Sequence, residues 1–397
     1  MKPAPHIAIL GAGPIGLDAA LAARESGWTC TVFEAGPGVG SHVRAWGHVR
    51  MFSPWALDLS ERMRRALAAP APADDPEDCP TGAEYVERVL EPLAGVLAGC
   101  IHTGARVVAV SRDATLKDDG IGSGVRALRP FRILVAHADG RESVHRADVV
   151  LDCTGTYGQP NPLGDGGIPA PGERAAEADI VRSIPDVRSD ASGWKGRRVL
   201  LVGAGHSAQT AARDLAGLAE RTGTQVLWAV REDPACFEPI PDDPLPERAA
   251  LARSAAALAA GRLPAVQVRA GRVVDAVARE GDALQVDLRR SDGAIERERV
   301  DRIVSLTGSI GDAGLYRQLQ VHECWATAGL MKLSAALLGA GSSADCLDQG
   351  GHGIDALRSP EPDFFVLGSK SYGRNNTFLL KVGFEQVDDV FAHLRAR

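Results

Sequence analysis

Short apolar runs followed by glycine-rich turns and helical patterns organise the chain. The first apolar run covers residues 6–10, residues 17–26 have the spacing of apolar positions typical of a helix, and a second apolar run covers residues 29–33. This order predicts a strand, a tight turn, a helix and a second strand. Such a unit is typical of the start of an α/β domain with a parallel sheet.

The turn after the first strand has the sequence Gly-Ala-Gly-Pro-Ile-Gly. Gly11 would let the chain turn sharply, Gly13 would let a pyrophosphate approach the backbone, and Gly16 would let helix and strand pack tightly. The helix N-terminus presents free N–H groups and a positive dipole to the phosphates. Glu34 closes the second strand, where a carboxylate can accept hydrogen bonds from ribose hydroxyls. The predicted dinucleotide-binding residues are Gly11, Gly13, Pro14, Gly16, Glu34 and Ala35.

The same plan returns in the second half of the chain. An apolar strand at residues 198–202 leads into a Gly-x-Gly-x-x-Ala turn, which precedes a predicted helix at 209–221 and a strand at 225–231. Arg231 closes that strand, and a guanidinium there suits the additional phosphate of NADP. Alternatively, Arg231 forms a surface salt bridge, and His206 only caps its helix. The predicted binding residues are Gly203, Gly205, His206, Ser207, Ala208 and Arg231.

Composition and charge narrow the class of protein. The chain has 397 residues, 45% of them hydrophobic, which suffices for two or more domains with their own cores. A net charge of −7 argues against a surface for nucleic acid or anionic membranes. No stretch approaches the ~20 apolar residues that cross a bilayer, and the opening apolar run is too short for a signal peptide. We therefore expect a cytoplasmic protein that acts on a small molecule.

The seven cysteines are scattered, odd in number and never spaced as Cys-x-x-Cys, so we expect no disulfide framework. His322, Cys324 and Cys346 match no standard zinc spacing, and no metal site is predicted. Cys324 and Cys346 could form a redox-active pair, but only their distance decides whether they can bond. The alternative is that they are structural or line a substrate site.

Further elements follow from apolar periodicity and from Pro- and Gly-rich breaks. Two strands end in Thr-Gly, and the segment at residues 157–162 is the clearest domain boundary. The other predicted elements are helices at 56–67, 82–98, 246–260 and 329–338, antiparallel strands at 101–103, 106–110 and 131–135, a strand at 364–368, and a helix at 375–394.

These units together resemble the two-dinucleotide-binding-domain flavoproteins, a superfamily that includes flavin-containing monooxygenases and thioredoxin-reductase-like enzymes. The resemblance covers nearly the whole chain and implies an α/β fold with two nested Rossmann-like three-layer domains. An FAD domain at residues 1–160 and 309–397 would carry an inserted NADPH domain at 161–308. FAD would bind the first glycine turn and NADPH the second. The resemblance also implies cofactor contacts from Val107 or Val108, beside the adenine, and from Thr154, Gly155, Thr307, Gly308 and Gly368.

The expected reaction depends on which branch of the superfamily the chain resembles. Its disulfide reductases need a Cys-x-x-Cys pair beside the flavin, which this chain lacks. The segment at residues 39–54 looks like the corresponding part of flavin-containing monooxygenases, although their histidine-bearing fingerprint is missing from residues 180–195. The resemblance implies a monooxygenase that transfers one oxygen atom of O2, through a flavin hydroperoxide, to a soft nitrogen, sulfur or metalloid nucleophile. The alternatives are an NADPH-dependent reductase of a thiol or disulfide, a quinone or a protein acceptor, and a non-catalytic nucleotide sensor.

Three residues are candidates for catalysis. Arg44 and His48 lie in a segment rich in Trp, His and Arg directly after the first nucleotide-binding unit, where they could steady a reduced flavin or contact substrate. The alternative is a buried loop whose arginines bridge backbone carbonyls. Asn375 precedes the C-terminal helix, which in the family points its N-terminus at the flavin. The family's Asp after Gly368 is missing here, so backbone amides or Ser and Asn side chains would replace it. A homodimer is an open possibility.

Overall fold

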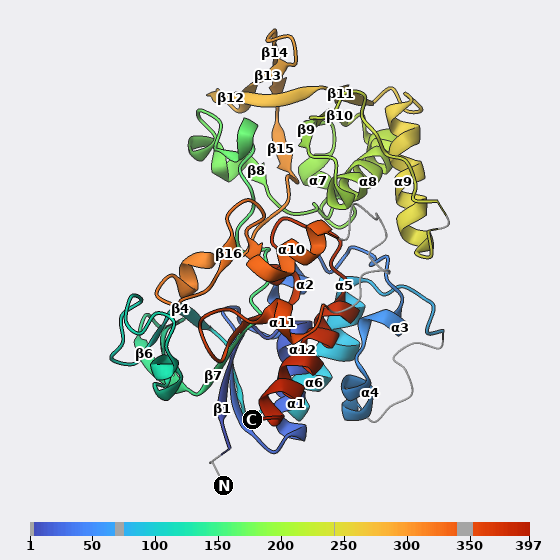
Figure 1. Cartoon of the computed structure of the whole chain (residues 1–397). Coiled ribbons are helices and arrows are strands. Elements are labelled where there is room, and N and C mark those ends of the chain that lie inside the picture. The colour runs from blue at the N-terminus through green and yellow to red at the C-terminus, as the bar shows by residue number, and fades with distance from the viewer. Residues whose placement is uncertain (1–3, 68–74, 242, 340–351) are drawn as a thin grey trace. The chain divides into compact units, whose positions relative to one another are not determined.

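The computed structural model describes residues 4–67, 75–241, 243–339 and 352–397. The chain folds into two compact units, the first made of Met1–Gln159 and Ile310–Arg397 and the second of Pro160–Ser309. Each unit contains a parallel five-stranded sheet, an antiparallel three-stranded sheet and helices (Figure 1). The predicted α/β fold class is therefore confirmed.

The parallel sheet of the first unit has the strand order β18-β7-β1-β2-β3. Its strands are β1 (His6–Leu10), β2 (Thr29–Phe33), β3 (Ile101–His102), β7 (Val149–Asp152) and β18 (Phe364–Val366). Because all five run in the same direction, their carboxyl ends share one edge of the sheet. Ligands of open parallel sheets bind outside that edge, so the segments that follow these strands define the region of interest.

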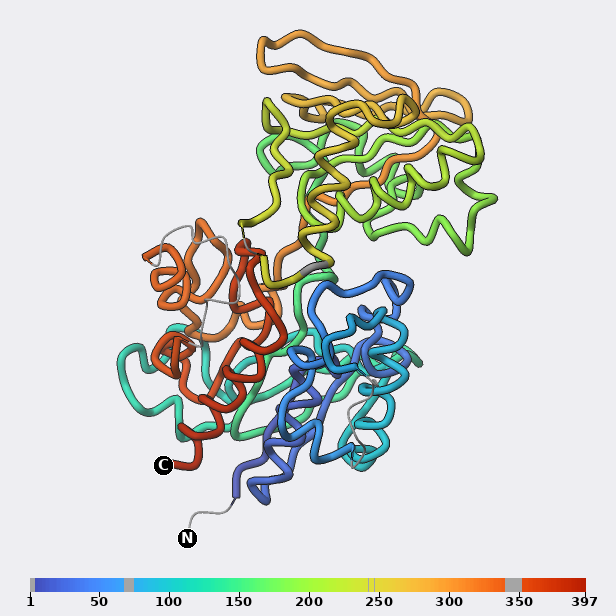
Figure 2. The backbone as a smooth tube through the Cα atoms, turned by 90° about the vertical axis from the view of Figure 1, so that its right-hand side faces the viewer, coloured from blue at the N-terminus to red at the C-terminus, as the bar shows by residue number. Residues whose placement is uncertain are grey.

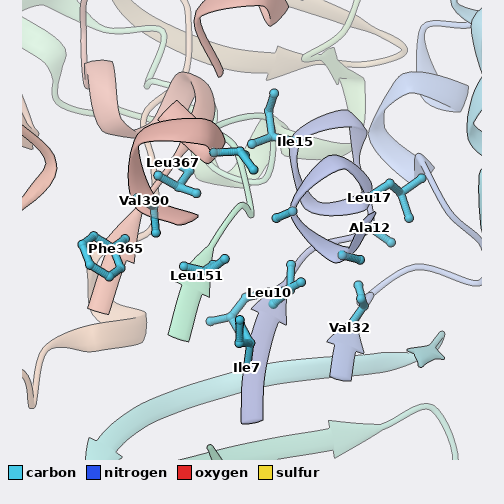
Figure 3. Packing of buried hydrophobic residues seen from close by; sticks show 14 of the residues in the cluster. Ile7, Leu10, Ala12, Ile15, Leu17, Val32, Leu151, Phe365, Leu367 and Val390 are labelled. Carbon is cyan, nitrogen blue, oxygen red and sulfur yellow. The ribbon is translucent and has the colours of Figure 1, made fainter. Parts of the chain in front are cut away.

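Two helices from opposite ends of the sequence pack against each other over this sheet, namely α1 (Pro14–Glu25) and α12 (Leu380–Arg395). The blue N-terminal and red C-terminal segments both belong to the first unit (Figure 2). Buried side chains of β1, β7 and β18 pack with those of the two helices (Figure 3). A Cβ atom at Gly383 would overlap the side chain of Ile15, so glycine lets α12 approach α1 closely.

The antiparallel sheet of the first unit consists of β4 (Ala105–Arg112), β5 (Phe131–His137) and β6 (Glu142–Ala147). β6 was not predicted, because most of its residues are polar and it has no continuous apolar face. The assignment of residues 101–103 to antiparallel strands is wrong. β3 pairs parallel to β2 and belongs to the main sheet.

The predicted helix at residues 56–67 is interrupted in the structure. Leu59 is extended, with φ −124° and ψ 134°, and the backbone N–H of Met63 donates to Ser60 Oγ at the start of the next helix. The predicted helix at 82–98 is one run with a π-helical middle, and it starts with a capping box between Thr81 and Glu84. The helices of this region are α2 (Ser41–Ala45), α3 (Trp55–Asp58), α4 (Glu61–Leu67), α5 (Gly82–Tyr85), η1 (Val86–Leu90), α6 (Glu91–Val96) and η2 (Gly124–Leu128).

The C-terminal part of the first unit starts its long helix later than predicted. Asn375 Oδ1 accepts hydrogen bonds from the backbone N–H and the hydroxyl of Thr377, and these local bonds compete with helix formation. The helix therefore begins at Leu380 rather than at residue 375. The other elements here are η5 (Ala313–Tyr316), β16 (Glu323–Cys324), β17 (Gly329–Leu330), α10 (Met331–Gly339), α11 (Ile354–Leu357) and η6 (Gly368–Tyr372).

The second unit repeats the plan of the first, with the parallel strand order β11-β10-β9-β15-β8. Its helix α8 starts at the glycine turn, at His206, three residues before the predicted start. The parallel strands are β8 (Ile180–Val181), β9 (Arg198–Val202), β10 (Gln225–Val230), β11 (Val266–Ala270) and β15 (Arg302–Ser305). The antiparallel strands are β12 (Arg272–Glu280), β13 (Ala283–Arg290) and β14 (Ile295–Val300). The helices are η3 (Asp165–Gly167), η4 (Arg174–Asp179), α7 (Ala191–Trp194), α8 (His206–Thr222) and α9 (Pro246–Ala259).

Candidate functional site

The three glycines of the first turn meet different surroundings. Gly11 has φ +96°, and a Cβ atom there would lie 2.7 Å from the carbonyl oxygen of Cys153. A Cβ at Gly16 would overlap the carbonyl oxygen of Gly11. Around Gly13, in contrast, no described atom outside its immediate chain neighbours lies within 4 Å of such a Cβ. The outer glycines are therefore required by the fold, whereas Gly13 leaves room for a group that comes from outside the turn.

Gly13 is also the N-cap residue of α1, and among the described residues no side chain caps this helix start. The helix N-terminus thus keeps the donor groups and the positive end of its dipole that favour an anion. Pro14 occupies the first turn, where its missing N–H costs nothing.

Glu34 follows β2 beside this turn and is 8% exposed. Its Oε2 accepts from the backbone N–H of Ala12 at 2.8 Å, and its Oε1 accepts from the backbone N–H of Gly36 at 2.8 Å. The carboxylate therefore fixes the loop around the glycine turn. A carboxylate oxygen has more than one lone pair, so Glu34 can still accept hydrogen bonds from hydroxyl groups. Ala35, the next residue, is exposed.

A buried ion pair lies at the carboxyl edge of the same sheet. Lys370, in η6, places its Nζ 2.6 Å from Asp152 Oδ2 at the end of β7, and both side chains are at most 2% exposed. The ammonium also donates to Thr154 Oγ1 at 3.1 Å and to the carbonyl oxygen of Asp312 at 2.9 Å. The other carboxylate oxygen, Asp152 Oδ1, accepts from the backbone N–H and the hydroxyl of Thr154. These bonds join three chain segments at the end of β7.

Glycines on both sides of this ion pair shape the edge of the sheet. Gly155 has φ +68° and lies near Ser369, whose Oγ would be 3.8 Å from a Cβ at that glycine. Gly368 has φ +74°, lies against Ile15 and donates its N–H to Gln386 Oε1 at 2.8 Å. Gly368 is thus close to the start of α1, and Gly155 is close to Ser369, the residue after it.

Asp152, Lys370 and Gln386 were not among the residues predicted from the sequence. Asp152 ends an apolar strand, and Lys370 follows a glycine at the end of another strand. Charged residues in such positions were the available signal, but the sequence did not show that they are partners. Ser371, which could have replaced the family's Asp, is fully buried and donates to the carbonyl oxygen of Gly368 at 2.7 Å. Of the two serines after Gly368, only the half-buried Ser369 has an exposed part.

The segment after the first nucleotide-binding unit holds the predicted catalytic residues Arg44 and His48. Arg44 donates from Nε to the carbonyl oxygen of Val39 at 3.1 Å and from Nη2 to Glu91 Oε1 at 2.7 Å. The Arg50 guanidinium donates to the carbonyl oxygen of Cys79. Each arginine donates to one backbone carbonyl and pairs with a carboxylate, so the alternative interpretation is met only in part, and the segment is not fully buried. His48 is exposed.

Two other predicted positions are shaped by local backbone geometry. Val108 is half exposed and is skipped in the register between β4 and β5, where Val107 pairs with Val135 and Ala109 with Leu134. This bulge interrupts the hydrogen-bond ladder, so the backbone around Val108 is suited to contact a bound group. Asn375 belongs to the turn before α12, as described above.

The second glycine turn repeats the geometry of the first. Gly203 has φ +125°, and a Cβ atom there would overlap the carbonyl oxygen of Leu306. Gly205 is the N-cap residue of α8, without a side-chain cap, and no described atom outside its immediate chain neighbours lies within 4 Å of a Cβ there. Ala208 is fully buried against the turn, and Ser207 is exposed. The second unit therefore has its own unobstructed helix N-terminus.

Charged side chains lie near His206, the first residue of α8. Burial, together with the nearby charge of Arg248, lowers the pKa of His206. Arg248 forms a buried ion pair with Asp243, with a shortest N···O distance of 2.6 Å. The Arg231 side chain is 79% exposed and lies 3.4 Å from Glu232. Arg231 therefore forms the weak surface ion pair that was the alternative interpretation, and it stays accessible to a ligand.

The second strand that ends in Thr-Gly is fixed within the second unit. Thr307 Oγ1 donates to the carbonyl oxygen of Asn161 at 3.0 Å, and the Asn161 side chain donates back to the carbonyl oxygen of Thr307 at 3.0 Å. Gly308 follows with φ +87°. Thr307 thus has a structural role, in addition to any contact with a cofactor.

The cysteines near the first site differ in reactivity. Burial and the Asp152 carboxylate raise the pKa of the Cys153 thiol well above its usual value. Hydrogen bonds from Thr327 and from backbone N–H groups lower the pKa of Cys324. Cys346 lies outside the described residues, so its pairing with Cys324 stays a prediction. Within the described ranges, no group of three or more His, Cys, Asp or Glu side chains could hold a metal ion.

None of the helices in the described parts of the chain has the length and apolar character that a membrane crossing requires.

No protein-family model matches the chain, and no curated protein matches it in sequence. Solved structures match over almost its whole length. The bacillithiol disulfide reductase Bdr (YpdA) from Bacillus cereus has a TM-score of 0.71 and 17% identity, with 99% of each chain covered. The Kutzneria sp. 744 ornithine N-hydroxylase, solved with reduced FAD, NADP+ and L-ornithine, has a TM-score of 0.66 and 15% identity, with 99% of this chain and 100% of that chain covered. The T. acidophilum thioredoxin reductase has a TM-score of 0.57 and 15% identity, with the same coverage. At these identities, the likeness establishes the fold.

Proposed function

Because the chain has the fold of the two-dinucleotide-binding-domain flavoproteins, we propose that it is an oxidoreductase that uses FAD and NADPH. We further propose that it is a monooxygenase of a small, soft nucleophile such as an amine, a thioether or a trivalent metalloid. One observation carries the proposal of two dinucleotides. In both units, the first glycine of the turn, Gly11 or Gly203, has no room for a side chain. The next glycine, Gly13 or Gly205, has open space around it and lies at the N-terminus of a helix without a side-chain cap.

Several groups of the first unit support the proposal that it binds FAD. Gly13 and the N-terminus of α1 would bind the pyrophosphate, and Glu34 would accept hydrogen bonds from the adenosine ribose. The bulge at Val108 would lie beside the adenine. Gly155 and Ser369 would contact the ribityl chain in place of the family's Asp, because Ser369 is the half-buried hydroxyl next to Gly155.

The second unit suits NADPH. Gly205 and the N-terminus of α8 would bind its pyrophosphate, with His206 and Ser207 in the first helical turn. Arg231 would pair with the additional phosphate of NADPH, for which it needs only to leave its weak contact with Glu232. Glu232 itself would repel that phosphate. The preference for NADPH over NADH would therefore depend on whether the attraction by Arg231 exceeds the repulsion by Glu232.

The thiol beside the first glycine turn, Cys153, favours oxygenation over disulfide reduction. A disulfide reductase needs a reactive thiolate beside the flavin, whereas Cys153, whose backbone lies against Gly11, is half-buried and has a raised pKa. The sequence has no Cys-x-x-Cys pair. When bound, FAD would supply hydride acceptance from NADPH and the activation of O2. The protein would position the nucleotides and fix the charged groups at the edge of the sheet, through Lys370 and Asp152.

The test combines oxygen uptake with isotope labelling. Purified protein is loaded with FAD, mixed with NADPH and isotopically labelled O2, and given an amine, a thioether or arsenite in turn. A monooxygenase consumes equal amounts of NADPH and O2 and places labelled oxygen in the product. NADPH oxidation that proceeds without O2 when a disulfide or quinone is added, and never labels a product, would instead identify the reductase. Failure of NADPH to reduce the bound flavin under any condition favours a nucleotide sensor.

A further inference from the structure

The fold brings together two cysteines that are far apart in the sequence. Cys30 is the second residue of β2, and Cys100 directly precedes β3. Each thiol lies close enough to the other to shift its pKa, and Cys100 Sγ donates to the carbonyl oxygen of Leu97 at 3.2 Å. Both thiols are free and half-buried. The structure therefore contains a close thiol pair that no sequence spacing indicated.

The backbone holds these cysteines at a separation that a disulfide can bridge. β2 and β3 pair in parallel, with Val32 opposite Ile101, and the N–H of Val32 donates to the carbonyl oxygen of Cys100 at 2.8 Å. Cys100 is thus level with Thr31, one position from Cys30. A strand spacing of about 4.8 Å and a rise of about 3.3 Å give a Cα separation of about 6 Å, within the range of disulfides. This Cα separation permits a disulfide.

The surroundings make Cys100 the more nucleophilic thiol of the pair. The nearby Cys30 thiol and the charge of Arg24 lower the pKa of Cys100, whereas the pKa of Cys30 is raised. Arg24 belongs to the last turn of α1, and its Nη1 donates to the carbonyl oxygen of Val96 at 3.0 Å. This bond keeps the guanidinium close to Cys100. A thiolate beside a second thiol is the arrangement in which oxidation stops at a disulfide.

We propose that Cys30 and Cys100 form a redox-active thiol pair, which a hydroperoxide such as hydrogen peroxide oxidises to an intramolecular disulfide. The Cys100 thiolate attacks one peroxide oxygen, the O–O bond breaks, and the leaving hydroxide takes up a proton to become water. The sulfur is then attacked by the Cys30 thiol, the S–O bond breaks, and a second water leaves with the Cys30 proton. Two thiols lose two electrons and two protons, and one peroxide is reduced to two waters.

This thiol pair is separate from the candidate cofactor site. Cys30 lies near the start of β2, whereas Glu34 follows its carboxyl end, and the glycine turn follows the carboxyl end of β1. Because parallel strands place these ends at opposite edges of the sheet, the thiol pair touches none of the proposed cofactor-binding residues. The proposal therefore does not depend on the proposed function.

Peptide mapping of the full-length protein tests the proposal. The native protein is treated with hydrogen peroxide, unfolded in the presence of N-ethylmaleimide and digested with trypsin. Cys30 and Cys100 are each the only cysteine of their tryptic peptides, which cover residues 25–44 and 89–106. We expect these two peptides to be joined, with a mass two hydrogens below their sum, and to separate on reduction.

Variants distinguish this pair from other thiols. Cys236→Ser, which removes an exposed cysteine of the second unit, should leave the cross-link unchanged. Cys30→Ser should abolish it and let dimedone trap a sulfenic acid at Cys100, while Cys100→Ser should abolish both products. Circular dichroism checks that each serine variant is folded. Peptides that stay unlinked after peroxide treatment, or that link to any other cysteine, would overturn the proposal, as would dimedone labelling at Cys30 rather than Cys100.

Discussion

Replacing Lys370 by methionine tests how much the buried ion pair contributes to the first unit. Methionine fills most of the same volume but removes the ammonium, and with it the hydrogen bonds to Asp152, Thr154 and the carbonyl oxygen of Asp312. Asp152, which is fully buried, then has no opposite charge at 2.6 Å. An uncompensated buried charge is the costly outcome, because water cannot replace the lost partner.

Breaking a buried ion pair from one side costs about 3–5 kcal/mol. For a folding unit of this size, 1 kcal/mol corresponds to about 2–4 °C, so we expect the melting temperature to fall by about 6–20 °C. The double variant Lys370→Met with Asp152→Asn should recover more than half of this loss. Asparagine is neutral, and its carbonyl oxygen can still accept the two hydrogen bonds from Thr154.

Urea unfolding followed by circular dichroism, without added cofactor, measures these free energies. Lys381→Met is the matched control. Lys381 is half exposed, and its ion pair with Glu385 is long, with an N···O distance of 4.0 Å, so its loss should change stability by less than about 0.5 kcal/mol. The reasoning is refuted if Lys370→Met costs less than about 1 kcal/mol, or if the double variant is no more stable than the single one.

Three further predictions concern the cofactors and the pH dependence of stability. Gly13→Val should weaken FAD binding at least about tenfold, equivalent to about 1.4 kcal/mol. Gly95→Ala, at another glycine with open space, should leave FAD binding unchanged, and equal FAD affinities of the two variants would contradict the proposed site. Arg231→Glu should lower the ratio of kcat/KM for NADPH to that for NADH about tenfold or more, and an unchanged ratio would remove Arg231 from the site. Burial raises the pKa of Asp58 to about 8, above the value of about 3.9 expected when unfolded, so the folded state holds an extra proton between these pH values. As the pH rises from about 4 to 8, the free energy of unfolding should therefore fall, by at most about 1.4 kcal/mol per pH unit. Asp58→Asn, whose amide oxygen can still accept the Ser53 hydrogen bond, should flatten this pH dependence in urea unfolding.

Local patterns in the sequence predicted the repeating architecture well. The strand, glycine turn and helix of each unit depend on contacts within a short stretch, and glycine at Gly11 and Gly203 is required by backbone conformation. Such features are encoded by residue type and spacing, which explains why the α/β fold could be predicted. The predicted cofactor contacts of Gly13, Glu34 and Gly205 stay predictions that the binding experiments above can test.

Elements without an apolar pattern, or with a competing local bond, were predicted less well. Most residues of β6 are polar, and its pairing depends on β5. The start of α12 is delayed by the side chain of Asn375. The parallel pairing of β3 with β2 joins strands separated by several helices, and no local signal fixes that direction.

The sequence by itself determined the two glycine turns and the alternation of strands and helices, because both depend on neighbouring residues. Only the tertiary structure decided which side chains became partners. Lys370 meets Asp152 because β18 lies beside β7, and Cys30 meets Cys100 because β2 lies beside β3. Both pairs depend on strand order in the sheet, which is fixed by packing across the whole unit. Residue spacing therefore could not reveal either the buried ion pair or the thiol pair.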